Sequence, residues 1–224
     1  MSLRILIYLF LLAIISTYGL VNYKKLTSPF KPLIALISYT LFSEVMCRIL
    51  AVKYHNNMIM YHIMLLVEYP LMATIYSRLF TVKNIQRFIR YSVIPFVVLL
   101  LANSLLVQKI RFSPFHVEFP SHILFLANGL YLIYSLLLFE AFLHKPSDIP
   151  IYKQAAFWFN TAILTLSSTL FLQLGLQNYF VRNGHKPELI DTIGYLINLL
   201  SYVLIGIAFY TDVSRLKQPV YESN

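Results

Sequence analysis

Seven apolar segments of about 20 residues, separated by short polar links, make up almost all of this 224-residue chain. A helix needs about 20 predominantly apolar residues to cross the hydrocarbon core of a bilayer. The residues are 58% hydrophobic and only 12% charged, which is about half the charge of a soluble domain. The sequence therefore predicts an all-α polytopic membrane protein, with one seven-helix transmembrane domain over residues 1–212 and a short cytoplasmic tail over 213–224.

The links between these segments contain proline, glycine or charged residues, which end or begin helices. The expected helices span about 4–21, 33–51, 57–80, 88–107, 121–143, 154–177 and 189–211. The first of them is almost purely apolar, so we expect it to face lipid. Because the number of helices is odd, the two termini should lie on opposite sides of the membrane.

The basic residues predict the orientation of the bundle. Of the 18 Lys and Arg residues, seven would lie on the side of the N-terminus and eleven on the other side. Cytoplasmic loops carry the excess of Lys and Arg, so the N-terminus is expected outside and the C-terminus in the cytoplasm. The net charge of +9 then reflects helix ends that meet lipid head groups, and no nucleic-acid partner is expected.

The third segment, from Asn57 to Phe80, carries Glu68 near its middle, followed by Tyr69 and Pro70. A carboxyl group at the centre of a transmembrane helix costs several kcal/mol, and such groups face the bundle interior or a water-filled cavity. Pro70 removes a backbone donor and kinks or loosens the helix near the acid. We therefore interpret Glu68 as a functional residue, because a helix bundle does not need a carboxyl group to pack.

Other polar side chains fall at about the same depth when each residue is given a rise of about 1.5 Å. They lie in the half of the bundle nearer the N-terminus, on six of the seven helices. The candidate ligand-binding residues are Glu44, Arg48, Tyr61, Glu68, Asn128, Gln173, Tyr195 and Asn198. The alternative for the neutral residues is a hydrogen-bond network that only joins helices, and Glu44 could simply pair with Arg48 at i, i+4.

Motifs of known chemistry are missing from the sequence. No Ser-His-Asp order, nucleophile elbow, P-loop or HExxH occurs, so the catalytic residues, if there are any, are unknown. Cys47 is the only cysteine, and His55 and His62 have no third ligand in register, so we expect no metal and no cofactor. The last helix contains no lysine that could hold retinal.

Two stretches carry a family resemblance, namely 152–180 and the Tyr61…Glu68-Tyr69 pattern. They resemble a group of small uncharacterised bacterial seven-helix membrane proteins, which are similar to the membrane sensor regions of some histidine kinases. The resemblance implies a sensor-like module in the bacterial cytoplasmic (inner) membrane. A second resemblance, to lysoplasmalogenase-like membrane hydrolases, rests on Lys31-Pro32 and on acids within helices, but Glu44 stands where that family would have a buried Asp.

An internal sequence similarity favours a further alternative, a protein built from a repeat of three helices. Residues Ser38–Glu44 and Ser167–Gln173 share four of seven residue types in register. The separation of Tyr61 and Tyr76 equals that of Tyr195 and Tyr210. Such similarities are expected if the first three and the last three helices form a parallel repeat, with the fourth helix as a linker.

Three functions follow from these patterns. The first is a receptor- or sensor-like module with a polar ligand site in the outer half of the bundle. It would bind membrane lipids around it, an unknown small ligand inside it, and a cytoplasmic signalling protein at the Arg78–Arg90 loop. The second is a small-solute or proton-coupled transporter with a 3+1+3 helix repeat. The third is an intramembrane lipid-modifying hydrolase that uses Glu44, Glu68 or Asp191.

Overall fold

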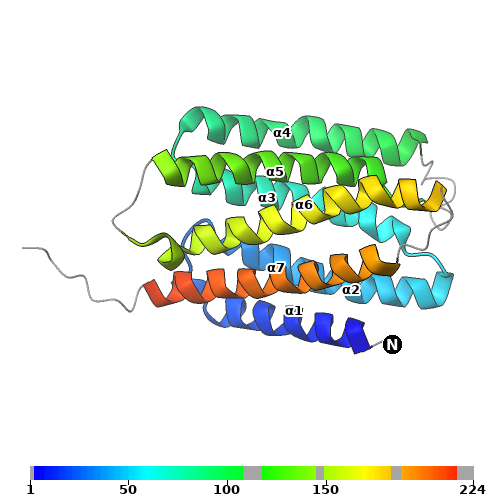
Figure 1. Cartoon of the computed structure of the whole chain (residues 1–224), viewed down its shortest axis with the longest axis horizontal. Helices are drawn as coiled ribbons and strands as arrows, with labels where there is room; N and C mark the ends of the chain where they lie inside the picture. The colour runs from blue at the N-terminus through cyan, green and yellow to red at the C-terminus, as the bar shows by residue number, and fades with distance from the viewer. Residues whose placement is uncertain (1–2, 108–117, 145–148, 183–187, 216–224) are drawn as a thin grey trace, which may run out of the picture.

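The computed structural model describes residues 3–107, 118–144, 149–182 and 188–215, and their side chains outside 177–191. These residues form seven long helices (Figure 1). The helices are α1 (Leu3–Val21), α2 (Lys31–Tyr54), α3 (Met58–Leu79), α4 (Lys83–Ala102), α5 (Ser121–His144), α6 (Ala155–Arg182) and α7 (Glu188–Arg215). A short π-helical segment, Asn103–Val107, extends α4.

All seven helices are long and apolar enough to cross a membrane, as expected. Large apolar side chains such as Leu6, Phe10 and Leu136 point outward and are 50–69% exposed. A soluble surface avoids continuous apolar patches of this extent, whereas lipid tails cover them at no cost. The protein is therefore an integral membrane protein with a helical bundle.

Six helices form a ring in the order α1, α2, α3, α5, α6, α7, and contacts between α1 and α7 close it. Helix α4 lies outside this ring against α3, at the edge of the bundle (Figure 1). The Tyr69 ring of α3 stacks on the Phe96 ring of α4, with centroids 3.7 Å apart. Any site inside the ring is consequently built by six helices and not by α4.

The bundle has two ends that we name by a residue at each. The Arg4 end, on the right in Figure 1, holds the start of α1, the end of α2 and the start of α3. The Thr27 end, on the left, holds the link between α1 and α2 and the last turn of α7. The link leads into the first turn of α2, which contains Pro32. Backbone N–H groups in the first turn of a helix have no acceptor within the helix, so a proline there costs no hydrogen bond.

Three expectations about individual helices are corrected by the structure. Helix α6 continues to Arg182, past the expected end at 177. Helix α4 begins at Lys83 and not near Phe88. The stretch from Lys83 to Arg87 contains neither Gly nor Pro, so its charged side chains simply point outward from the first helical turns. Helix α1 does expose apolar residues, but its Tyr8 is buried and points into the ring, so α1 is not only a lipid-facing helix.

The Thr27 half of the ring is filled by aromatic side chains whose polar atoms are paired. Tyr76 donates a hydrogen bond to Asn160 Oδ1 (3.1 Å) and its hydroxyl lies 2.6 Å from Ser135 Oγ. Asn160 donates through Nδ2 to the Ser135 carbonyl oxygen (2.9 Å). Tyr76, Asn160 and Ser135 have no exposed surface. This network joins α3, α5 and α6, and the rings of Phe30 and Phe159 pack edge to face beside it.

A second polar contact closes the same end. Asp212 of α7 accepts a hydrogen bond from the Thr27 backbone N–H at Oδ2 (2.8 Å). The Thr27 hydroxyl donates to Oδ1 (2.9 Å) and also lies 3.1 Å from Oδ2. Asp212 is only 3% exposed, so these bonds replace the hydration that the carboxyl group loses. The contact ties the α1–α2 link to α7.

Candidate functional site

A cavity of about 300 Å³ lies inside the ring, towards the Arg4 end, and we call it the central cavity. All six ring helices contribute to its wall, which is mainly apolar. Its polar and aromatic lining residues are Tyr8, Thr40, Glu44, Tyr61, Glu68, Phe119, Asn128, Tyr131, Ser167, Asn198 and Tyr202. Among the described lining residues there are two acids and no Lys, Arg or His.

The central cavity stops at the filled half of the bundle. Its wall on α3 ends at Met72, one turn before Tyr76. Beyond that level Tyr76, Phe159 and Phe209 are completely buried. In this conformation the cavity therefore does not run through the bundle.

Glu68 is placed on the cavity wall by the middle of α3. Because helical residues three or four apart share a face, Tyr61, Leu65, Glu68 and Met72 line the same cavity. The described residues offer Glu68 no ion pair. The Tyr131 hydroxyl of α5 lies beside the Glu68 carboxyl group, but the pair does not reach standard hydrogen-bond geometry.

Tyr131 itself is an unusual feature of the wall. It is only 3% exposed, yet its buried hydroxyl has no hydrogen-bond partner among the described residues. The buried Asn198 Oδ1 of α7 is in the same situation. Buried polar atoms without a partner cost about 1–3 kcal/mol each, and they are rare in folded proteins. Because they lie on a cavity wall, water or a bound molecule in the cavity can supply their partners.

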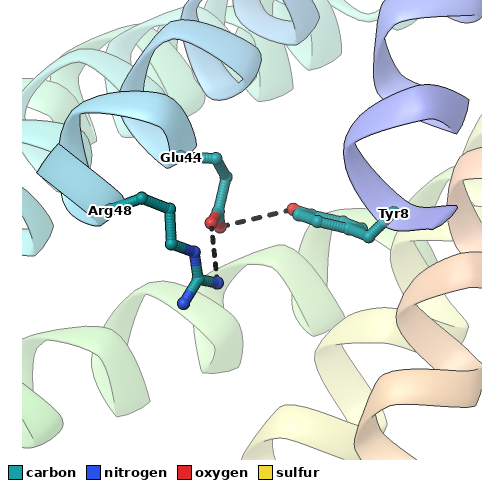
Figure 2. Close-up of polar contacts among 3 residues, drawn as sticks. All are labelled: Tyr8, Glu44 and Arg48. Carbon is teal, nitrogen blue, oxygen red and sulfur yellow. Dashed lines mark hydrogen bonds and ion pairs between the residues drawn. The ribbon is translucent and has the colours of Figure 1, made fainter. Parts of the chain in front are cut away.

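The carboxylate of Glu44 has an ion pair and a hydrogen bond, in contrast to that of Glu68. Its Oε2 lies 3.6 Å from Arg48 Nη2, one turn along α2, and its Oε1 accepts a hydrogen bond from the Tyr8 hydroxyl at 3.4 Å (Figure 2). Figure 2 shows Glu44 between the two partners, with Tyr8 reaching across from α1. The Tyr8 ring also packs edge to face on Tyr202 of α7, with centroids 5.6 Å apart. Glu44 thus links α1, α2 and, through Tyr8, α7.

A second cavity of about 320 Å³ lies towards the Arg4 end, and we call it the end cavity. Its wall contains two arginines, Arg4 and Arg48, and it shares Tyr8, Glu44, Leu170 and Asn198 with the central cavity. The Tyr195 hydroxyl donates to the Arg4 carbonyl oxygen (3.0 Å), and the Arg4 guanidinium lies 5.8 Å from the centre of the Tyr195 ring. The two cavities therefore form neighbouring compartments, one acidic and apolar and one basic.

The eight candidate residues from the sequence all line one or both compartments. The central cavity contains Glu44, Tyr61, Glu68, Asn128 and Asn198. The end cavity contains Glu44, Arg48, Gln173, Tyr195 and Asn198. The Asn128 amide donates to the Leu124 carbonyl oxygen of its own helix (2.8 Å), and Gln173 packs against Gly194, where an added Cβ would lie 2.6 Å from Gln173 Oε1. That these residues bind a ligand stays a prediction.

Sequence reasoning did not select Tyr8, Tyr131 and Tyr202 as site residues. Tyr8 had a signal that was available: it shares one helical face with Leu12, Ile15 and Gly19, and this face is the buried one. Tyr131 lies three residues after Asn128, and Tyr202 lies four residues after Asn198, so each tyrosine shares a helical face with a predicted site residue. This spacing is the signal that could have identified them.

His62 has both ring nitrogens close to protein atoms. Its Nδ1 lies 2.7 Å from Ser104 Oγ in the π-helical segment after α4, and its Nε2 lies 3.2 Å from the Glu118 carbonyl oxygen. These contacts make His62 a structural residue that joins α3 to the end of α4. The described residues contain no group of three or more His, Cys, Asp or Glu side chains arranged for a metal ion. Asp191, an acid proposed from the sequence, has a side chain outside the described ones.

No protein family, curated protein or solved structure matches the chain.

Proposed function

We propose that this protein is a receptor- or sensor-like module of the bacterial inner membrane that binds a small amphipathic ligand in the central cavity. The observation that carries the proposal is the contrast on the cavity wall. It is mostly apolar, yet it holds a carboxyl group without an ion pair, Glu68, and an unpartnered buried hydroxyl, Tyr131. Ligand sites typically combine an apolar lining with a few polar groups that orient the ligand.

The shape of the bundle supports binding from one side. The central and end cavities lie towards the Arg4 end. Beyond the central cavity, the inside of the ring is filled by the Tyr76–Asn160 network. A separate hollow of about 500 Å³ lies at the Thr27 end, where Thr27 and Asp212 line it. With the predicted orientation, the Arg4 end is the outer face and the ligand enters from outside. A signal would then be a shift of the helices that line the cavity, because α3 and α7 also carry residues of the filled half.

The Thr27 end offers a surface for a cytoplasmic signalling protein. The predicted Arg78–Arg90 loop is a short link between α3 and α4 flanked by helical turns. Arg78 is held by the Ser28 carbonyl oxygen at 2.8 Å, whereas Lys83 and Arg87 are exposed. An acidic partner surface would complement these residues. Basic side chains at this level also suit anionic lipid head groups.

The test is mass spectrometry of small molecules that copurify with the protein in mild detergent. The variants are wild type, Glu68→Gln, and Glu140→Gln as a matched control. Glu140 is an exposed acid on α5 that lines neither compartment. We expect a near-stoichiometric compound in wild type and in the control, and its loss from a folded Glu68→Gln protein. Equal retention by all three proteins, or no compound in any of them, would contradict the proposal.

The 3+1+3 transporter is the second candidate, and the order of the ring favours it. A parallel repeat equates α1–α3 with α5–α7, so the contact between α3 and α5 should correspond to the contact between α7 and α1, and both are present. Helix α4 lies outside the ring, as a linker would. Glu44 and Gln173 occupy equivalent repeat positions and both line the end cavity. Against the repeat, Tyr76 is buried and its counterpart Tyr210 is 64% exposed.

A transporter must open the filled half to release its substrate, whereas a receptor needs only to rearrange it. Uptake of the copurifying compound into proteoliposomes separates the two functions. Flux that is lost in Glu68→Gln and kept in Glu140→Gln would favour the transporter. Chemical conversion of the compound, in place of flux, would favour the lipid-modifying hydrolase.

A further inference from the structure

We propose that the ligand of the central cavity is a small apolar amine, whose ammonium group pairs with Glu68 and whose body lies against the aromatic wall. This inference rests on the proposed function, because it names the chemical class of the ligand for the same cavity. It follows from the charge balance of the wall, from its aromatic rings, and from its volume.

The wall of the central cavity carries more acidic than basic side chains. Two carboxyl groups line the central cavity, and the described lining residues include no cationic side chain. The charge of Glu44 is balanced by Arg48, which lines the neighbouring end cavity and lies 3.6 Å from the Glu44 carboxylate. The Tyr8 hydroxyl donates a hydrogen bond to the same carboxylate. Glu68 has no such cation among the described residues. A carboxylate that is removed from water keeps its charge only beside a partner of opposite sign, so a cationic group on the ligand would complement an ionised Glu68.

The remaining polar atoms are suited to a donor-rich group. Asn198 Oδ1 is a buried acceptor without a partner, and the Tyr131 hydroxyl beside Glu68 can accept as well as donate. A protonated primary amine carries three donors and no acceptor. It can therefore bind Glu68 and Tyr131 together. A carboxylate or phosphate ligand would instead meet acceptors and be repelled by Glu68.

The aromatic wall favours an organic cation over a bare metal ion. Five aromatic residues, Tyr8, Tyr61, Phe119, Tyr131 and Tyr202, line the cavity. The rings of Tyr61 and Phe119 already pack edge to face, with centroids 5.1 Å apart. Aromatic faces attract ammonium groups and pack against hydrocarbon. A hydrated inorganic cation would leave this apolar surface in contact with water, and the described residues contain no group of three or more His, Cys, Asp or Glu side chains arranged to bind a metal ion.

The cavity volume limits the size of the amine. A water molecule occupies about 30 Å³ of the liquid, so a cavity of about 300 Å³ holds on the order of ten non-hydrogen atoms. A phenylalkylamine with a chain of two to six carbons has this size and combines one ammonium group with an apolar body. The corresponding phenylalkyl alcohols have the same shape and no charge.

Binding of these matched amines and alcohols to the full-length protein in lipid nanodiscs tests the proposal. Affinity is measured by native mass spectrometry and by the thermal shift of unfolding. At least one amine should bind wild type saturably, and at least tenfold more tightly than its alcohol. Glu68→Gln should reduce the affinity for that amine at least tenfold and leave the alcohol unchanged, while Glu140→Gln should change neither. If Glu68→Gln does not fold, the comparison of amine and alcohol in wild type decides alone.

A variant that narrows the cavity separates the failure of this inference from the failure of the proposed function. Ser167 is 1% exposed and lines the cavity from α6, so Ser167→Leu should block binding without a change of charge. If alcohol and amine bind wild type equally and both are lost in Ser167→Leu, the cavity is a ligand site but the ligand is not an amine. If the alcohols bind wild type, are lost in Ser167→Leu, and no amine binds, only the amine inference is wrong. If Ser167→Leu binds these compounds as well as wild type, the central cavity is not the binding site and both proposals are wrong.

Discussion

The two halves of the bundle differ in whether buried polar atoms at their centre have hydrogen-bond partners. In the Thr27 half, the hydroxyl and amide groups of Tyr76, Ser135 and Asn160 bond to one another across three helices. Towards the Arg4 end, Tyr131 and Asn198 leave buried oxygen atoms without partners beside the cavities. The same residue types therefore hold helices together at one end and line cavities towards the other.

This contrast separates the part of the bundle that holds the helices together from the part proposed to bind a ligand. In lipid, hydrogen bonds and close packing hold helices together, because the surroundings are as apolar as the helix surfaces. A filled and fully paired half supplies that cohesion. The other half can then keep unpaired groups, which lower stability but leave binding capacity for a ligand. Stability and function commonly conflict in this way at binding sites.

The largest expected effect is the loss of the central residue of the paired network. Asn160→Ala removes two interhelical hydrogen bonds and leaves a void at a site with no exposed surface. We expect it to lower the free energy of unfolding by about 3 kcal/mol, measured by denaturation with dodecyl sulfate in mixed micelles.

Asn128→Ala is the matched control for this variant, because Asn128 lies at the central cavity and donates only within its own helix. It should cost less than about 1 kcal/mol, since no bond between helices is lost. Equal losses in the two variants would contradict the division of the bundle into a cohesive half and a binding half.

A smaller effect is expected where the α1–α2 link meets α7. Asp212→Ala deprives the Thr27 backbone N–H and hydroxyl of their acceptor. The loss of charge-assisted bonds should lower the free energy of unfolding by about 2 kcal/mol. Thr27→Ala keeps the backbone bond and should cost about half as much. If Asp212→Ala unfolds at the same denaturant concentration as wild type, this contact does not secure the Thr27 end.

Much of the fold could be predicted from the sequence, because transmembrane helices are defined by local composition. Length and hydropathy identified all seven helices, and most of their ends agree with the structure to within a few residues. The start of α4 was wrong since a run of charges suggested a loop. No glycine or proline interrupts that run, so the helix continues through it.

The candidate site was predicted in outline from the cost of burying Glu68 and from the common depth of the polar residues. The partners of these residues could not be predicted, since they come from helices far apart in the chain. Tyr8 reaches Glu44 from 36 residues away, and Tyr76 reaches Asn160 from 84 residues away. Nothing in the local sequence separates Tyr76 from Tyr131, because both are tyrosines within apolar helices. Only the three-dimensional packing makes one a paired residue and the other an unpaired one.

This pair of tyrosines allows the smallest and most specific test of the comparison. Tyr76→Phe removes a hydroxyl that bonds to Ser135 and Asn160 and leaves their polar atoms buried without it, so it should cost about 1–2 kcal/mol in the free energy of unfolding. Tyr131→Phe removes a buried hydroxyl without a partner. Its cost in the ligand-free protein should therefore lie within about 0.5 kcal/mol of zero, or the variant should be slightly more stable.

Adding the phenylalkylamine that binds wild type most tightly should then stabilise wild type more than Tyr131→Phe, because the variant lacks a group beside Glu68. A loss of 1 kcal/mol or more in ligand-free Tyr131→Phe would show that this hydroxyl is already satisfied within the bundle, and the two halves would then differ in volume but not in hydrogen bonding.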